Sequence, residues 1–144
     1  MSTGVVRVLV VEDDDAWREF VVSAVQQGPG VQVVSEIADG AQALRTVARL
    51  RPDLVMLDIG LPGLNGIEVA RRIQRLYPES RILFVSQETS EDVVEEALST
   101  GALGYLLKAD AGSELLAGVN SVLLGKRFMS RTIRRVESRP AHQD

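Results

Sequence analysis

The sequence predicts an α/β fold built on a parallel sheet of five strands, and two patterns indicate it. Short aliphatic runs recur along the chain between turn residues, which is typical of strands buried on both faces. Between these runs, apolar residues recur at the i, i+3, i+4 and i+7 spacing of amphipathic helices. Strands that alternate with helices of about ten to fifteen residues form βαβ units, whose strands run parallel and whose helices cover the sheet.

Length and composition restrict the class of protein. With 144 residues, 45% hydrophobic and 25% charged, the chain is expected to form one globular domain that buries about two thirds of its unfolded surface. No apolar run approaches the ~20 residues of a membrane span, and the N-terminus lacks the pattern of an export signal. Cys is absent, which excludes disulfides, thiol catalysis and Cys-ligated zinc. A cytoplasmic protein is expected, and a net charge of −4 gives no general attraction to nucleic acid or membranes.

The first strand is expected at residues 5–11, an apolar run that leads into Glu12 and Asp13. The helix after it has one apolar stripe, formed by Trp17, Phe20, Val21, Ala24 and Val25. Gly28-Pro29-Gly30 ends this helix. Residues 31–37 then alternate between apolar and polar side chains, which favours a strand at the edge of the sheet.

The central strand is the run Leu54 to Leu57, which continues directly into Asp58 before Gly and Pro break the chain. Helices are expected on both sides of it, one from Asp39-Gly40 to Arg51 and one from Ile67 to Tyr77. In open parallel sheets, ligands bind outside the carboxyl ends of the strands, where Asp58 is placed. A simpler interpretation is that Asp58 caps the next helix, but other strands that also end in polar side chains favour a functional site.

The fourth strand, residues 82–85, ends in Ser86, and the fifth, residues 103–107, ends in Lys108. Helices are expected after each of them, the last one ended by Gly125. Residues 126–144 are different, because cations predominate and few side chains are apolar. We therefore expect a folded domain over residues 1–125 and a basic tail or linker over 126–144, with some helix near Thr132 to Glu137.

Four of these strands end in polar groups that would meet at one edge of the sheet: Glu12 with Asp13, Asp58, Ser86 and Lys108. Two carboxylates about 4 Å apart repel by roughly 4 kcal/mol at an effective dielectric constant near 20, so a cluster of three favours a bound cation. Oxygen ligands without His or Cys select a hard ion, and this set suits Mg²⁺. Lys108 and Ser86 suit phosphate oxygens, and an aspartate between the two sites can act as a nucleophile that forms an acyl phosphate.

These motifs resemble the receiver domain of two-component response regulators, most closely the subfamily whose full-length members carry a helix-turn-helix output domain. The likeness covers about residues 5–125. The matching segments are Val10-Val11-Glu12-Asp13, Asp58-Ile59-Gly60-Leu61-Pro62 with Gly66, Ser86, and the run from Gly101 to Lys108 that contains Tyr105. The resemblance implies a flavodoxin-like three-layer α/β/α fold, whose doubly wound sheet has the strand order 2-1-3-4-5.

The resemblance also implies a role for each residue of the site. Asp58 accepts a phosphoryl group from a histidine kinase or phosphotransfer protein. Asp13, Asp58 and the main-chain carbonyl of Gly60 hold Mg²⁺, and Glu12 acts mainly through a bound water. Lys108 and Ser86 hold the phosphoryl oxygens.

A conformational switch is implied as well. The phosphoryl group would draw Ser86 inward, and Tyr105 would turn from the surface into the space behind it. The face formed by the helix near 91–100, the fifth strand and the helix near 112–124 would then bind a partner or a second copy of the chain.

Three positions depart from the commonest family pattern. The acidic pair is Glu12-Asp13 where Asp-Asp is commoner, and Ala109 follows Lys108 where many members have proline. The chain also ends near residue 144, before any helix-turn-helix sequence. DNA binding is therefore expected only through an output domain outside this chain, and no membrane contact is expected.

Two rival functions remain in view. A receiver is not an enzyme beyond gaining and losing its own phosphoryl group, whereas a small phosphohydrolase would use Asp58 as a nucleophile on a substrate. Such enzymes place an acid/base aspartate two residues later, where this chain has Gly60, so this interpretation ranks low. The other rival is a DNA-binding regulator of which this chain is the excised receiver, and a stand-alone receiver remains the alternative.

Overall fold

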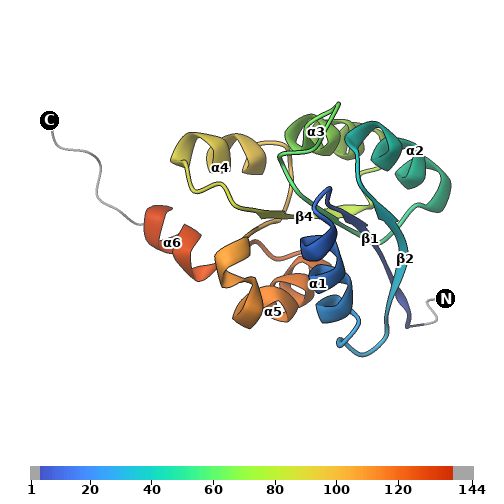
Figure 1. The fold of residues 1–144 in the computed structure, drawn as a ribbon, viewed down its shortest axis with the longest axis horizontal. Coiled ribbons are helices and arrows are strands. Elements are labelled where there is room, and N and C mark those ends of the chain that lie inside the picture. Colours follow the sequence, from blue (N-terminus) through green and yellow to red (C-terminus); the bar gives the residue numbers. More distant parts are fainter. Residues whose placement is uncertain (1–3, 138–144) are drawn as a thin grey trace, which may run out of the picture.

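The computed structural model describes residues 4–137 and has three layers (Figure 1). A six-stranded sheet, of order β2-β1-β3-β4-β5-β6 with every neighbouring pair parallel, lies between two layers of helices. Helices α2, α3 and α4 cover one face, and α1 and α5 cover the other. The elements are β1 (Val6–Val11), α1 (Asp15–Val25), β2 (Val31–Ile37), α2 (Gly40–Leu50), β3 (Leu54–Leu57), α3 (Gly66–Leu76), β4 (Arg81–Ser86), α4 (Glu91–Leu98), β5 (Gly104–Leu107), the 3₁₀ turn η1 (Lys108–Asp110), α5 (Ala111–Leu123), β6 (Phe128–Met129) and α6 (Arg131–Glu137).

The expected α/β architecture is confirmed, including the position of β2 at an edge and the order β2-β1-β3-β4-β5. The central strands feed two hydrophobic cores because successive side chains point to opposite faces. In β3, Val55 and Leu57 pack under α2, α3 and α4, whereas Leu54 and Met56 pack under α1 and α5. All four side chains are at most 1% exposed, which explains why β3 is continuously apolar rather than alternating.

The register of the strands aligns their carboxyl ends. Val11 of β1 pairs with Leu57 of β3, and Leu57 pairs with Phe84 of β4. Ser86, at the end of β4, pairs with Leu107, at the end of β5. The residues that follow β1, β3 and β5 therefore leave the core at the same edge as Ser86.

Local signals in the sequence explain where the helices begin. Asp14, Asp39 and Asn65 each precede a helix, and each side chain accepts a hydrogen bond from a backbone amide in the first turn. Gly66 is required by a close approach, because a Cβ atom there would lie 1.9 Å from the carbonyl oxygen of Asp58. The start of α3 is thus pressed against the end of β3.

The sheet has a sixth strand that the expectation of five strands lacked. Phe128 and Met129 form β6, which pairs with Gly104 and Tyr105 of β5. Both β6 and α6 belong to the segment that the sequence analysis separated as a basic tail, and its helical part near Thr132 is confirmed. Residues 138–144 of that segment lie outside the described residues.

One part of the expected core is at the surface. In α1, Val21 and Val25 are buried as expected, but Phe20 is 40% exposed and its ring contacts Trp17 edge to face. The buried stripe of α1 is therefore narrower than expected from the sequence, because Phe20 lies outside it.

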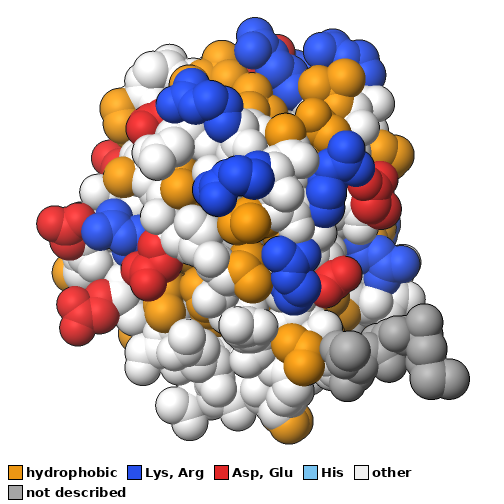
Figure 2. All heavy atoms as spheres, turned by 90° about the vertical axis from the view of Figure 1, so that its right-hand side faces the viewer, with side chains coloured by type: hydrophobic (Ala, Val, Ile, Leu, Met, Phe, Trp, Pro, Cys, Tyr) orange, Lys and Arg blue, Asp and Glu red, His pale blue; other side chains and the backbone are white. Residues whose placement is uncertain are grey.

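Charge is unevenly distributed over the molecule. Figure 2 shows Lys and Arg side chains gathered in the upper part of the face on which α2 lies. The groove between α2 and α3 contains Arg45, Arg72 and Arg75 and only one acid, Glu68. Glu68 is paired with Arg71 and Arg72, so this face is basic although the chain as a whole is acidic.

Within residues 4–137, none of the helices has the length and apolar character of a membrane-spanning segment.

Candidate functional site

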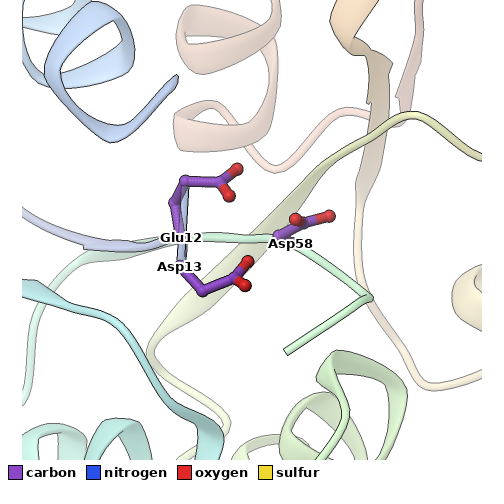
Figure 3. A group of neighbouring side chains, drawn as sticks. All are labelled: Glu12, Asp13 and Asp58. Atoms are coloured by element: carbon purple, nitrogen blue, oxygen red, sulfur yellow. The ribbon is translucent and has the colours of Figure 1, made fainter. Parts of the chain in front are cut away.

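Three carboxylates meet at the carboxyl edge of the sheet (Figure 3). Glu12 and Asp13 follow β1, and Asp58 follows β3. One carboxylate oxygen from each residue lies within 4.8 Å of the other two. Glu12 and Asp58 are buried, whereas Asp13 faces solvent. The structure therefore brings together the three acids that the sequence predicted to converge.

Lys108 lies against the buried side of this acidic cluster. It is the first residue of η1, and its side chain is 5% exposed. Its Nζ lies 2.7 Å from Glu12 Oε1 and 3.4 Å from Asp58 Oδ2. The ring centroid of Trp17 is 5.2 Å from the same nitrogen, within the range of a cation–π contact. One lysine thus opposes two buried carboxylates.

Backbone amides fix the orientation of both buried carboxylates. The amide of Ile59 donates to Asp58 Oδ1 at 2.7 Å, and the amide of Asp14 donates to Glu12 Oε2 at 3.0 Å. In each residue the other oxygen faces Lys108. One oxygen of Asp58 is therefore fixed by a backbone amide, and the other faces the ammonium group of Lys108.

Burial and charge shift the proton affinities in this cluster. Burial raises the pKa of Glu12, and the charge of Asp58 adds to this, while the hydrogen bond from Lys108 acts against it. Burial alone would lower the pKa of Lys108, but the hydrogen bond to Glu12 and the charge of Asp58 reverse this and raise it overall. Lys108 therefore remains protonated near neutral pH.

Ser86 and Tyr105 form a second, uncharged part of the site. Ser86 is 2% exposed, and its Oγ accepts a hydrogen bond from the amide of Glu88 at 3.1 Å. The ring of Tyr105 is fully buried, and its hydroxyl donates to the carbonyl of Glu88 at 2.8 Å. Burial raises the pKa of Tyr105 to about 12, with the Ser86 hydroxyl acting in the opposite direction.

The position of Tyr105 bears on the expected switch. From the sequence, the ring was expected to turn from the surface to the inside when the switch operates. In the structure the ring is inside, 6.2 Å from Phe84 by ring centroids, which corresponds to the inward position of that switch. Met129 of β6 and Ile133 of α6 belong to the same hydrophobic core as this ring.

Comparison with known proteins identifies the family. The family model of the response regulator receiver domain matches residues 8–120. The chain belongs to the response regulator receiver family. Two curated relatives are a probable transcriptional regulatory protein NarL from Mycobacterium tuberculosis, 36% identical over 128 residues, and the response regulator GacA from Pseudomonas viridiflava, 30% identical over 128 residues. Both alignments cover 89% of this chain but only 59% and 60% of the relatives, so the chain spans about 60% of their length.

Solved structures agree with this assignment. A two-component response regulator of the LuxR family from Aurantimonas sp. SI85-9A1 is 33% identical, with a TM-score of 0.87, and covers 91% of this chain and 94% of its own. The signal receiver domain of a NarL response regulator from Mycobacterium tuberculosis is 35% identical, with a TM-score of 0.80, and covers 85% and 98%. The chain is therefore a receiver domain of the two-component type.

The acids of this receiver domain fit a divalent cation. Every side-chain ligand in the cluster is a carboxylate, the donor preferred by Mg²⁺. With all groups ionised, three negative charges face the single positive charge of Lys108, which leaves two negative charges to be neutralised. Gly60, the source of the predicted carbonyl ligand, lies at the exposed surface of the loop between β3 and α3.

Two features around the site were not predicted from the sequence. Trp17 was assigned to the core of α1, although its ring also covers the ammonium group of Lys108. Arg18 was not singled out, yet its guanidinium donates to the carbonyl of Glu12 at 2.9 Å and holds the end of β1. The position of Trp17 four residues after Asp13, on the first turn of a helix, was the available signal.

The peptide bond between Lys108 and Ala109 is trans, like all peptide bonds in residues 4–137.

Proposed function

We propose that this receiver domain accepts a phosphoryl group on Asp58 from a phosphohistidine of a histidine kinase or phosphotransfer protein. The observation that carries the proposal is the position of the Asp58 carboxylate, buried between two other acids and the ammonium group of Lys108. An Asp58 oxygen attacks phosphorus, the new O–P bond forms, and the P–N bond to the donor imidazole breaks. The electron pair of that bond and a proton remain with the imidazole.

The residues around Asp58 prepare it for this reaction. Lys108 loses its contact with Asp58 Oδ2 when that oxygen becomes part of an acyl phosphate, and its ammonium group then binds a phosphoryl oxygen. Ser86 Oγ accepts a hydrogen bond from the Glu88 amide, and its own hydroxyl can donate to a phosphoryl oxygen. Mg²⁺, held by Glu12, Asp13, Asp58 and the carbonyl of Gly60, would neutralise the charge that accumulates on the phosphoryl oxygens.

The rival function as a phosphohydrolase lacks a proton donor. Gly60 stands two residues after the nucleophile, and an added Cβ atom there would meet nothing within 4 Å, so the position is open and carries no acid. Asp58 is accordingly proposed to gain and lose its own phosphoryl group rather than to turn over a substrate. The phosphorylated domain is proposed to signal in the cytoplasm to a partner, to a second copy, or to a DNA-binding output domain, since curated relatives are named transcriptional regulators.

Phosphorylation with a small-molecule donor tests this proposal. Wild-type protein incubated with acetyl phosphate and Mg²⁺ should gain one acid-stable, base-labile phosphoryl group by intact mass, and EDTA should prevent it. Asp58→Asn should abolish the gain, whereas Asp92→Asn, which removes an exposed acid of α4, should leave it unchanged. Unchanged labelling of the Asp58→Asn variant would refute the site.

A further inference from the structure

The end of the described chain closes the outer side of β5 and reaches both cores. Phe128 packs in the core under α5, where a Cβ atom at Gly118 would come within 2.9 Å of its ring. Ile133 of α6 is fully buried in the other core, which also contains Tyr105. We call residues 128–135 the C-terminal clamp. It is anchored too firmly by packing to be a loosely attached tail.

Ser130 continues the β5–β6 pairing with its side chain. It is fully buried, and its amide donates to the carbonyl of Tyr105 at 3.0 Å. At the next step along β5, the amide of Leu107 donates at 2.9 Å to Ser130 Oγ rather than to a backbone carbonyl. The Leu107 amide, immediately before Lys108, is thus bonded by the clamp through Ser130, which lies between the end of β6 and the start of α6.

Thr132 holds the other end of the turn that carries Lys108. Its amide and its hydroxyl donate to the two carboxylate oxygens of Asp110, at 3.0 and 2.9 Å. Burial raises the pKa of Asp110, but hydrogen bonds from the Ser130 hydroxyl and from Thr132 outweigh this and lower it overall. Asp110 is therefore an ionised acceptor at neutral pH.

Lys108 lies between the two residues that the clamp holds. Leu107 immediately precedes η1 and Asp110 is its last residue. From the first residue of this turn, Lys108 Nζ lies 2.7 Å from Glu12 Oε1 and 3.4 Å from Asp58 Oδ2. A lysine side chain is flexible, so its placement depends on the backbone from which it extends. The pairing of β6 with β5 ends at Met129, and beyond it the Leu107 amide is bonded by the Ser130 side chain.

We propose that Ser130 and Thr132 are positioning residues that fix the β5–α5 turn, so that Lys108 is directed at the phosphoryl group on Asp58. The proposal rests on the phosphorylation proposed above. Because coupling between two sites is reciprocal, a phosphoryl group that engages Lys108 stabilises the docked clamp by the same factor. The clamp is thereby the segment through which the state of Asp58 is transmitted toward the chain that follows residue 135.

The first test compares two buried hydroxyls. Ser130→Ala removes the contact to Leu107. Ser80→Ala removes an equally buried hydroxyl that lies just before β4, at the amino ends of the strands, and donates to the Pro52 carbonyl. With acetyl phosphate and Mg²⁺, Ser130→Ala should lower the rate of phosphorylation about fivefold or more, because a misplaced Lys108 stabilises the transferring phosphoryl group less well. Ser80→Ala should keep the wild-type rate, even with a similar loss of thermal stability. Equal rates in the two variants would overturn the proposal.

A double-mutant cycle distinguishes positioning from general destabilisation. If Ser130 acts through Lys108, Ser130→Ala should add little to the slow phosphorylation of Lys108→Ala. Full additivity of the two effects would contradict the proposal. Thr132→Val, which keeps the amide contact to Asp110 and loses only the hydroxyl, serves where Ser130→Ala is too unstable, and it should slow the rate in the same way.

Hydrogen exchange on the unmodified chain tests the reciprocal effect. Beryllium fluoride with Mg²⁺, a mimic of the phosphoryl group, should slow exchange of the Ser130 and Thr132 amides relative to Mg²⁺ alone. Exchange that is unchanged or faster would refute the coupling. Failure of the wild type to become phosphorylated at all would instead refute the proposed function, so the two failures are distinguishable.

Discussion

At the scale of single residues, the site is a balance between one cation and three anions. Lys108 lies closer to Glu12 than to Asp58, at 2.7 against 3.4 Å. The longer side chain of Glu12, compared with the aspartate commoner at this position, allows it to reach the ammonium group. Lys108 is thus bound more closely by Glu12 and still lies next to Asp58, the residue proposed to be phosphorylated. Asp13 has no such partner among the described ion pairs and contributes mainly repulsion until a cation binds.

Asp13→Asn should therefore change stability in opposite directions with and without Mg²⁺. Without metal, the substitution removes one charge from the cluster and should raise the free energy of unfolding by roughly 1 kcal/mol, the size of one exposed charge pair at this separation. With several millimolar Mg²⁺, the wild type should gain stability and the variant should gain much less. Urea unfolding with Mg²⁺ or EDTA measures both effects. Equal stabilisation by Mg²⁺ in both proteins would exclude Asp13 as a ligand.

Tyr105 provides a pH test of its buried position. Its pKa is raised to about 12, above the value near 10 of an unfolded tyrosine. The stabilisation linked to this shift is therefore complete below pH 10 and is lost as the pH rises from 10 toward 12. Full loss corresponds to roughly 3 kcal/mol.

Tyr105→Phe serves as the matched variant because it keeps the ring and cannot ionise. It should be less stable than wild type near pH 8, by about 0.5–1.5 kcal/mol for the lost hydrogen bond to the Glu88 carbonyl. Between pH 10 and 12 the difference should close and then reverse, as measured by urea unfolding at each pH. Parallel pH curves would mean that the ring is accessible to solvent.

At the scale of elements, the sequence predicted well where an apolar run met a polar end. The strand ends at Glu12, Asp58 and Lys108 were located because each follows several residues buried on both faces. β6 gave no such signal, because two residues are too few to display alternation. Its docking depends on the space above Gly118 and on the hydroxyl of Ser130, which become visible only when distant parts of the chain are packed together. The inward position of Tyr105 depends on the same packing.

Ile133→Ala tests whether α6 is part of the folded domain. The side chain is fully buried, so truncation should lower the free energy of unfolding by about 2–5 kcal/mol. Leu124→Ala is the control, since Leu124 is 71% exposed and its truncation should change stability by less than about 0.5 kcal/mol. Chemical denaturation of both variants decides the matter. A small effect at Ile133 would place α6 outside the cooperative fold.

At the scale of the whole molecule, parallel strands of matched register explain why one edge of the sheet carries the site. The β2-β1-β3-β4-β5-β6 order places β1, β3, β4 and β5 next to one another, so their carboxyl ends deliver acids, a hydroxyl and an ammonium group to one place. β6 extends this arrangement by joining the end of β5 to the C-terminal clamp. The fold and the site were thus largely predictable from the strand ends, whereas the connection to the C-terminus required the packed structure.

The most direct test of the central claim is to locate the phosphoryl group chemically. Borohydride reduces an acyl phosphate of aspartate to homoserine, which marks the modified residue permanently. After treatment with acetyl phosphate and Mg²⁺, reduction and peptide mass mapping should find homoserine at position 58 and aspartate at Asp13. Homoserine at another position, or aspartate alone at position 58 in protein that has gained the mass of a phosphoryl group, would contradict the account.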